Sequence, residues 1–410
     1  MRQLTTKALT PLVLVGLALL AMGQGRTTSF YGWPAEVVPS PEEARVMEAI
    51  VNALPGFHGR PLQWDAALVE AAREVAERLS RDFRIREKVF TDDDLYRYLR
   101  EAGVFETRLY YSYVVFNRSE ELGEFIRERV ARSVSGEGFT HLGVGLVQGS
   151  RGMGYLVVIL TTKLVTLEPL PRQLPGPGDA GLRGWTVAAG RGMKVKGLLT
   201  LPSGEVVPLE LRNRVGRFWA EVPFRRGPGL YHLELIGERK GQTMVAGLLE
   251  VRVGEPGSDQ AVPDDFYFGH QLLVTQAESE MAMVRMINSF RARQGLRLLQ
   301  VNPRLMTMAR DQSQDMAAHN FFGHESPTRG DFARRRRAAG FTAVSMQENL
   351  AIHNSLDGAM KALLESPAHR QNLINPEFDS VGVGIVVQEY AGQRTYYISQ
   401  EFARLGIRGR

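Results

Sequence analysis

The feature that most constrains this chain is an internal repeat. Residues recur at a constant separation of 237 positions, and the matched pairs are Ile50 and Ile287, Gln63 and Gln300, Leu68 and Leu305, Ala72 and Ala309, Arg73 and Arg310, and Ala102-Gly103 and Ala339-Gly340. The pattern Phe-x-x-x-Gly-Val-Gly at 139–145 returns at 378–384, a separation of 239. Two near-constant separations predict two copies of one fold that differ by a couple of loop residues.

The two copies differ in the residues that can carry chemistry. His324 and Glu348 of the second copy fall opposite Glu87 and Tyr111 of the first, and His369 falls near residues 130–132. A duplicated fold that keeps one polar constellation and loses the other indicates that function resides in the second copy.

Length and composition predict a globular protein of several domains. At 410 residues the chain is too long for one core, so two or three domains are expected. Its 50 basic and 45 acidic residues leave a net charge of +5, which is too small and too mixed to indicate a nucleic-acid partner. The densest basic run, Arg334–Arg337, is interpreted as the solvated face of a helix.

Residues 1–23 have the pattern of a secretory signal. Arg2 and Lys7 precede the apolar stretch Leu9–Ala21, which is shorter than the roughly 18 residues of a spanning helix. Ala21-Met22-Gly23 offers a small-x-small cleavage site, and an uncleaved anchor is the alternative. The chain has no cysteine, hence no disulfide and no lipid attachment site. We expect a bacterial protein that is secreted, periplasmic or held in the cell envelope, without a stable membrane span after cleavage.

Hydrophobic periodicity divides the mature chain into three folded parts. Helical spacing followed by two buried strands predicts an α/β unit with an antiparallel sheet over 38–166 and again over 273–406. Short alternating strands over 183–254 predict a small immunoglobulin-like β-sandwich. Proline and glycine between these parts predict linkers at 167–182 and 255–272.

Five motifs lie in order within the second copy. They are His324-Glu325-Ser326-Pro327, Glu348-Asn349-Leu350-Ala351, Ser366-Pro367-Ala368-His369-Arg370, Val381-Gly382-Val383-Gly384 and Gln400-Glu401-Phe402. In this order they resemble the CAP superfamily (cysteine-rich secretory proteins, antigen 5 and pathogenesis-related 1), in its disulfide-free bacterial branch. The resemblance covers about a third of the chain, and the first copy would be a degenerate member.

The resemblance implies a three-layer α-β-α sandwich with a central cleft that holds two histidines and up to two glutamates. His324 and His369 match the histidines, and Glu348 matches the first glutamate. Glu365 and Glu401 are the candidates for the second. In some members of the family the histidines bind a divalent metal.

The residues of the cleft are compatible with three kinds of site. His324 and His369 could hold Zn²⁺, although no cofactor is certain, with Glu348 as base. The same three groups could act as a metal-free acid/base set. They could also serve only to tie loops together through hydrogen bonds. Further candidate ligand-binding residues are Ser326, expected to cap a helix, Asn349 and Arg370.

Three functions therefore stay open at the level of sequence. The second copy could bind a small ligand, a lipid, a cell-envelope component or a divalent metal. It could be a weak, peptidase-like hydrolase that uses His324, Glu348 and His369. The whole chain could instead be structural or adhesive, with its N-terminal domains as a surface for a protein partner. In the first copy, Tyr110, Tyr111 and Tyr113 are expected to pack the sheet.

Overall fold

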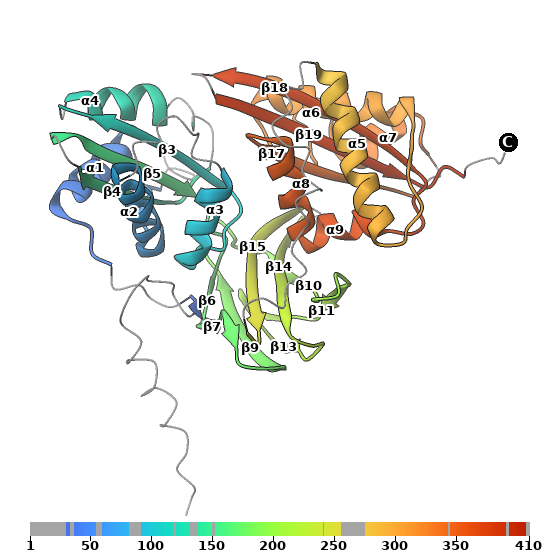
Figure 1. Ribbon diagram of the computed structural model, residues 1–410, viewed down its shortest axis with the longest axis horizontal. Helices are drawn as coiled ribbons and strands as arrows, with labels where there is room; N and C mark the ends of the chain where they lie inside the picture. Colours follow the sequence, from blue (N-terminus) through green and yellow to red (C-terminus); the bar gives the residue numbers. More distant parts are fainter. Residues whose placement is uncertain are drawn as a thin grey trace, which may run out of the picture.

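The fold is taken from a computed structural model. It describes residues 30–32, 37–54, 60–81, 92–118, 120–131, 134, 138–149, 152–240, 242–255, 275–342, 345–390 and 393–406. The predicted signal, residues 1–23, lies outside the described residues, as do His58, Glu87 and most of the predicted linker 255–272. Figure 1 shows an α/β part at each side and an all-β part below and between them.

The N-terminal α/β part is built on a four-stranded sheet. Its elements are α1 (Pro41–Ala53), β2 (Gln63–Trp64), α2 (Ala66–Arg81), α3 (Asp92–Glu101), β3 (Leu109–Phe116), α4 (Glu120–Glu124) continued by a π-helix (Phe125–Ala131), β4 (His141–Gln148) and β5 (Gly154–Thr161). The strand order is β2-β4-β5-β3, with only β2 parallel to its neighbour. Helices α2 and α3 pack on one face, and α1 and the π-helix pack on the other.

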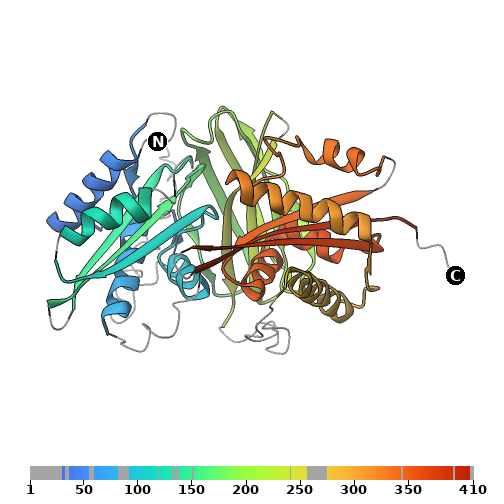
Figure 2. The same ribbon diagram turned by 90° about the horizontal axis from the view of Figure 1, so that it is seen from above.

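The C-terminal α/β part has the same plan. Its elements are α5 (Gln276–Arg293), β16 (Gln300–Val301), α6 (Pro303–His319), α7 (Phe332–Ala338), β17 (Met346–His353), α8 (Leu356–Glu365), α9 (Pro367–Ile374), β18 (Ser380–Tyr390) and β19 (Gln393–Ala403). The strand order is β16-β18-β19-β17, and again only the short first strand is parallel. Figure 2 shows helices on both faces of this sheet, which makes three layers. Helices α5, α8 and α9 cover one face, and α6 and α7 cover the other.

Glycines bring a helix against the central strand in both α/β parts. A Cβ at Gly143 of β4 would lie 2.2 Å from the backbone of Leu68, and a Cβ at Gly382 of β18 would lie 2.2 Å from the backbone of Leu305. Because any side chain there would push the helix away, the spacing of Gly-Val-Gly follows from close packing of α2 on β4 and of α6 on β18.

A buried ion pair is also present at matched positions. Glu43 of α1 binds Arg73 of α2 at 2.5 Å, and Glu280 of α5 binds Arg310 of α6 at 2.6 Å. Each carboxylate also accepts a hydrogen bond from a strand N–H, at 3.2 Å in the first part and 3.4 Å in the second. These residues at a separation of 237 therefore occupy matching places in the helices of the two α/β parts.

The middle part consists of two sheets that share one apolar core. One sheet has the order β11-β10-β14-β15-β8 and the other β12-β13-β9-β6. The strands are β6 (Val165–Leu167), β8 (Gln173–Leu174), β9 (Gly178–Thr186), β10 (Lys194–Thr200), β11 (Val206–Leu209), β12 (Arg212–Arg214), β13 (Arg217–Phe224), β14 (Gly229–Arg239) and β15 (Gln242–Val253). A separate ribbon pairs β1 (Phe30–Tyr31) with β7 (Leu170–Pro171).

The prediction of a linker at 167–182 is wrong. These residues form β7, β8 and the first half of β9, and Leu167, Leu170 and Leu182 are buried in the core of the middle part. Proline marked the segment as irregular, but Pro171 lies in a two-residue strand at a sheet edge, where the missing N–H is tolerated.

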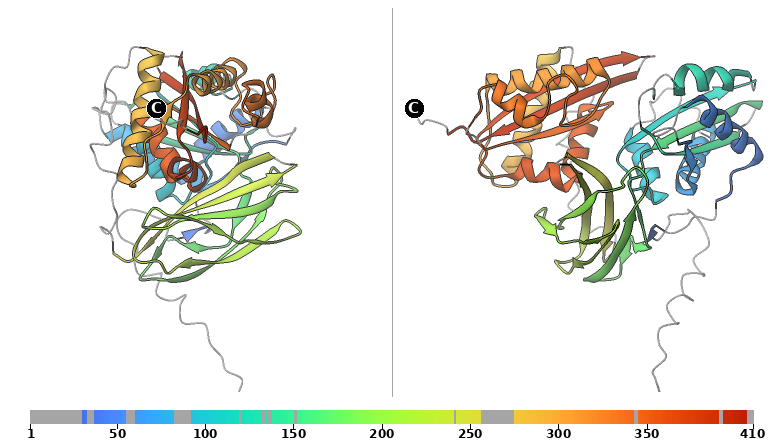
Figure 3. Two further views of the ribbon diagram at one scale, coloured as in Figure 1. Left: turned by 90° about the vertical axis from the view of Figure 1, so that its right-hand side faces the viewer. Right: turned by 180° about the vertical axis from the view of Figure 1, so that it is seen from behind.

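One arginine joins all three parts. Arg100 of α3 forms ion pairs with Glu250 of β15 and, at 2.6 Å, with Glu365 at the end of α8. Figure 3 shows the middle part in contact with both α/β parts from two further directions. Within the described residues, no helix has the length and apolar character needed to cross a membrane.

Candidate functional site

The centre of the candidate site is a pair of glutamates on neighbouring strands. Glu348 of β17 lies directly opposite Glu401 of β19 in the antiparallel register, so both side chains extend from the same face of the sheet. Both residues are buried, with 5% and 0% of their surface exposed. Two carboxylates side by side in a low-dielectric setting repel each other unless a cation or a proton separates them.

The cation is Arg335 of α7. Its Nη1 donates to Glu348 Oε2 at 2.7 Å and its Nη2 donates to Oε1 at 2.9 Å, while Nη1 lies 3.9 Å from Glu401. The expectation of a solvated face for Arg334–Arg337 is therefore wrong for Arg335, which is buried. A seven-residue helix with four consecutive arginines has to turn one of them toward the sheet, and this one meets a carboxylate.

His324 approaches Glu348 from the loop between α6 and α7. Its Nδ1 lies 2.8 Å from Glu348 Oε1, and Arg335 Nη2 donates to its backbone carbonyl at 2.9 Å. The imidazole is 45% exposed, whereas the Glu348 side chain is 1% exposed. A carboxylate only accepts, so Nδ1 of His324 carries the proton of this hydrogen bond.

The two glutamates differ in their protonation. Burial raises the pKa of Glu348, but hydrogen bonds from His324 and Arg335 outweigh it and the net pKa is lowered. Burial and the adjacent Glu348 raise the pKa of Glu401 well above its usual range. Glu348 is thus the member that ionises first and Glu401 the member that keeps its proton to higher pH, a division imposed by their environments. Of the two candidates for the second glutamate, Glu401 lies beside Glu348, whereas Glu365 binds Arg100.

His369 belongs to α9, on the other side of strand β17. Ser366 caps this helix, and its hydroxyl lies 2.8 Å from His369 Nδ1. Burial, followed by the charge of His324, lowers the pKa of His369 to about 4. The imidazole is therefore neutral at pH 7 and is close enough to His324 to sense its charge.

Asn349 connects α9 to the sheet from the face opposite Glu348. Its Nδ2 donates to the His369 carbonyl at 3.1 Å and to Gln400 Oε1 at 3.2 Å, and its Oδ1 accepts from Asn372 at 2.8 Å. Consecutive strand residues point to opposite faces, so Glu348 holds the His324 loop while Asn349 holds the His369 helix. The Glu-Asn pair of the motif lies within strand β17.

Two predicted ligand-binding residues lie elsewhere. Ser326 is buried, donates to Asp315 and accepts from the backbone N–H groups of Thr328 and Arg329. It orders its own turn and does not cap a helix, because Asp331 caps α7. Arg370 donates to the carbonyl of Gly204 in the middle part at 3.0 Å and lies over the ring of Phe290. These two side chains order the surroundings of the cleft.

The N-terminal part carries apolar groups where the C-terminal part has the charged cluster. In the strand register, Tyr111 opposite Ile159 takes the place of Glu348 opposite Glu401. Tyr98 precedes Ala102-Gly103 by the same spacing with which Arg335 precedes Ala339-Gly340. Tyr98, Ile159 and Tyr111 belong to one apolar cluster, which Tyr113 also joins. Tyr110 packs on the opposite face, so all three tyrosines of β3 pack the sheet as expected.

Some polar atoms of the cluster are buried and unpaired. Within the described residues, Glu401 Oε2, Gln400 Nε2 and Arg335 Nε have no hydrogen-bond partner. Over the same residues, no group of three or more histidine, aspartate or glutamate side chains is arranged to hold a metal ion. Both oxygens of Glu348 already accept hydrogen bonds from Arg335.

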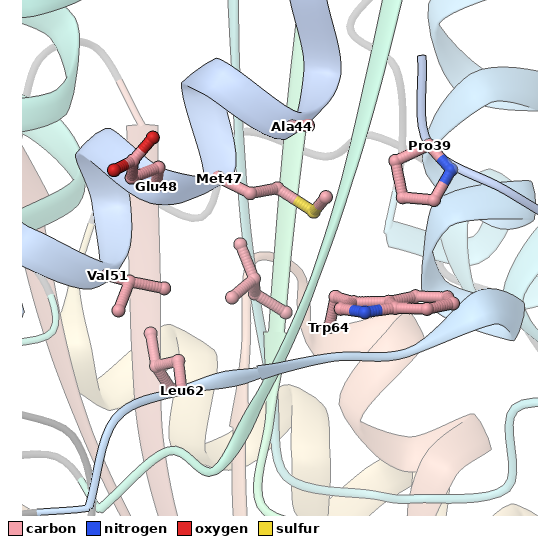
Figure 4. A pocket seen from close by; sticks show the side chains of 8 residues that line it. Pro39, Ala44, Met47, Glu48, Val51, Leu62 and Trp64 are labelled. Atoms are coloured by element: carbon pink, nitrogen blue, oxygen red, sulfur yellow. The ribbon is translucent and has the colours of Figure 1, made fainter. Parts of the chain in front are cut away.

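An apolar pocket lies in the N-terminal part. It has a volume of about 390 Å³ and is lined by Pro39, Ala44, Met47, Glu48, Val51, Leu62, Trp64 and Leu142. Figure 4 shows how the labelled side chains of its lining lie around it. Its lining is apolar except for Glu48, so it lacks the converging polar groups of a reaction centre.

The C-terminal part of the chain is similar to a known family. Residues 284–402 match the model of the CAP family, described as the cysteine-rich secretory protein family. The C-terminal part of the chain is therefore a CAP domain, and it contains no cysteine.

Two relatives from Bacillus subtilis are similar to part of the chain. "Uncharacterized protein YkwD" of Bacillus subtilis (strain 168) is 37% identical over 108 residues, which is 26% of this chain and 42% of that protein. "Uncharacterized membrane protein YlbC" of the same organism is 30% identical over 131 residues, 32% of this chain and 35% of that protein. The matched region thus spans less than half of either relative.

Two solved structures extend over more of the chain. An extracellular protein containing a SCP domain from Bacillus anthracis is 16% identical, with a TM-score of 0.28, and covers 77% of this chain and 93% of its own. A cysteine-rich secretory protein from Staphylococcus aureus is 13% identical, with a TM-score of 0.26, and covers 60% and 83%.

Proposed function

We propose that this chain is an exported binding protein whose C-terminal cleft takes a small ligand through the Nε2 atoms of His324 and His369, with a divalent metal such as Zn²⁺ as the simplest ligand. The observation that carries the proposal is the hydrogen bonding at Nδ1 of both rings. Nδ1 of His324 is held by Glu348 and Nδ1 of His369 by Ser366. Imidazoles tied in this way present Nε2 as a ligand atom.

The donor set supports an open site. Two imidazoles leave positions of a tetrahedral zinc ion for water or for an oxygen of a small ligand. The unpaired Glu401 Oε2, on the face of Glu348, and the unpaired Gln400 Nε2, on the face of Asn349, are polar atoms that such a molecule or ordered water could bind. When bound, a zinc ion would polarise an oxygen of the ligand.

The hydrolase alternative is less favoured by the same contacts. A general base needs a free lone pair directed at the reacting proton. Glu348, the predicted base, accepts from Arg335 on both oxygens and from His324 on one. Its lowered pKa makes it a weak base. Its role in this proposal is to orient His324 and to keep Nδ1 protonated.

The other two parts of the chain are proposed to be separate domains. We infer three domains at about 38–162, 165–254 and 275–406, the first a degenerate copy of the CAP domain and the second an immunoglobulin-like spacer. Apolar replacement of the charged cluster supports a packing or protein-binding role for the first domain. The predicted signal at 1–23 and the absence of cysteine support export to the periplasm, the cell envelope or the medium.

A calorimetric zinc titration of the full mature chain tests the proposed function. We expect one zinc ion per chain and loss of binding in His324→Ala/His369→Ala. His319→Ala is the matched control, because His319 is 47% exposed on α6 and bonds only to Asp315 among the contacts described. Zinc binding that the double variant retains would refute the site. If the wild type binds no zinc, zinc is not the ligand, and the result favours a structural role for the cluster.

A further inference from the structure

A carboxylate of the middle domain reaches the cleft helix. Glu234 of β14 accepts a hydrogen bond from Ser366 Oγ at 2.7 Å through Oε1, and one from the Ala368 N–H at 2.7 Å through Oε2. Glu234 has no exposed surface, and Ser366 is 6% exposed. The strand that supplies Glu234 lies 132 residues before Ser366 in the chain, so this contact exists only because the middle domain docks on the CAP domain.

The hydroxyl of Ser366 has a single proton, and the direction of its hydrogen bond determines the tautomer of the neighbouring His369. Ser366 donates its hydroxyl proton to Glu234 Oε1, while Glu234 Oε2 accepts from the Ala368 N–H. Ser366 Oγ then has to accept from His369 Nδ1, which lies 2.8 Å away. His369 is therefore protonated on Nδ1 and carries its lone pair on Nε2.

We propose that Glu234 is a positioning residue of the CAP cleft, which acts through Ser366 to fix the tautomer and the ring orientation of His369. The middle domain is thus part of the site and not only a spacer. This inference deepens the proposed function, and rests on it for the use of Nε2 as a ligand atom.

A second contact links the middle domain to the segment that carries His324. Gln242, at the start of β15, donates to Glu325, the residue after His324. One sheet of the middle domain therefore contacts the segments of both histidines. Burying a carboxylate without a cation is costly, and burial raises the pKa of Glu234. An apolar residue in place of Glu234 would join the two domains at a lower cost in free energy. The presence of a carboxylate is therefore explained by the hydrogen bonds that it accepts from Ser366 and Ala368.

Nitrogen-15 NMR of the histidine rings in the full mature chain tests the inference without zinc. Protonated and unprotonated ring nitrogens give well separated shifts, and His369→Gln assigns the signals among the eight histidines. We expect wild-type His369 at neutral pH to have a protonated Nδ1 and an unprotonated Nε2. A wild-type ring protonated on Nε2 would overturn the proposal.

Glu234→Gln should reverse the tautomer. A glutamine oxygen that accepts from Ala368 directs its NH₂ at Ser366, whose hydroxyl must then donate to His369 Nδ1. We expect the proton to move to Nε2, and affinity for zinc to fall roughly 10- to 100-fold. Glu238→Gln is the matched control, since Glu238 lies on the same strand and pairs with Lys196 of the middle part at 2.5 Å, so the substitution should leave His369 unaltered. A folded Glu234→Gln protein with an unchanged His369 tautomer would refute the proposal.

Ser366 offers an independent route should Glu234→Gln fail to fold. Ser366→Ala removes the link and should give His369 a mixture of tautomers, while Ser366→Thr keeps the hydroxyl and the helix cap and should restore the wild-type tautomer. An unchanged His369 tautomer in Ser366→Ala would count against the relay. Because the tautomer is read without zinc, the expected NMR result together with an absence of zinc binding would refute only the proposed function.

Discussion

At the scale of single residues, the buried charge of the CAP domain is organised around Arg335. This guanidinium binds Glu348, which ionises first, with two hydrogen bonds and lies near Glu401, which keeps its proton to higher pH. The two carboxylates therefore share one cation. His324 completes the coordination of Glu348 and is the exposed member of the cluster.

Removal of Arg335 should be strongly destabilising. Arg335→Met leaves Glu348 buried without its cation, which costs about 3–5 kcal/mol of unfolding free energy. Arg337→Met is the control, because Arg337 is exposed and should change stability by less than about 0.5 kcal/mol. Urea denaturation of both variants measures the difference. Equal, small effects would show that the Arg335 pair is not a buried ion pair in solution.

The raised pKa of Glu401 gives stability a pH dependence with a definite sign. The folded state holds the proton of Glu401 more tightly than the unfolded chain, so this group's contribution falls as pH rises above about 4.5 toward its folded pKa. Glu401→Gln mimics the protonated form and does not ionise. We expect the variant to match the wild type near pH 4 and to gain relative stability as pH rises, in urea titrations from pH 4 to 9. A difference that is constant with pH would show that Glu401 does not hold a proton.

The residues of the site that stand in local sequence motifs could be predicted from the sequence. The residues that join the site only through long-range contacts could not. His324, Glu348 and His369 stand in recognisable motifs. Arg335 lies in a run of four arginines, which hides the one that faces inward. Glu234 contacts Ser366 across 132 residues, and nothing in its own strand distinguishes it from a solvent-facing position.

At the scale of elements, glycine spacing sets how closely helices lie on the sheets. Gly145 of β4 faces the backbone of Ala72, and Gly384 of β18 faces the backbone of Ala309, both with 2.2 Å for an added Cβ. Neither helix can move away without separating its buried glutamate–arginine pair from the strand. The periodicity predicted these helices and strands well, because local apolar spacing determines which face is buried.

Substitution of either glycine should therefore overpack the interface. Gly384→Ala and Gly145→Ala place a methyl group against helix backbone, and we expect each to lower the unfolding free energy by about 1–3 kcal/mol. Gly176→Ala is the control, since a Cβ there meets nothing within 4 Å. Thermal unfolding followed by circular dichroism compares the three. An unaffected Gly384→Ala protein would contradict the close packing of α6 on β18.

The segment 167–182 shows the limit of the pattern at this scale. Four prolines between Pro169 and Pro177 predicted a linker, yet the segment supplies edge strands and half of β9. Its buried leucines receive their partners from strands up to about 80 residues later, such as β15, and a local window cannot include these partners.

At the scale of the whole molecule, the three parts meet through charges and not only through apolar surface. Arg100 contacts Glu250 of the middle part and Glu365 of the CAP domain, and its side chain is 26% exposed. Glu234 and Arg370 add contacts between the middle part and α9. The position of the middle part is therefore coupled to the helix that carries His369.

Arg100→Ala should loosen this assembly. It leaves two largely buried carboxylates without their shared cation, and we expect a loss of about 1–3 kcal/mol in unfolding free energy, together with faster proteolysis between the parts. Arg81→Ala, which removes an exposed pair with Glu77, serves as the control. Limited proteolysis and urea denaturation report on both. Identical cleavage rates for the two variants would mean that Arg100 does not hold the parts together.

The most direct test of the account is the response of the histidine ring nitrogens to zinc. Addition of one equivalent of Zn²⁺ to the nitrogen-15 labelled mature chain should shift Nε2 of His324 and His369 together, while Nδ1 of both rings stays protonated. Shifts confined to other histidines, or coordination through Nδ1, would contradict the proposed cleft. An absence of any shift at these two rings would place them in a purely structural hydrogen-bond network.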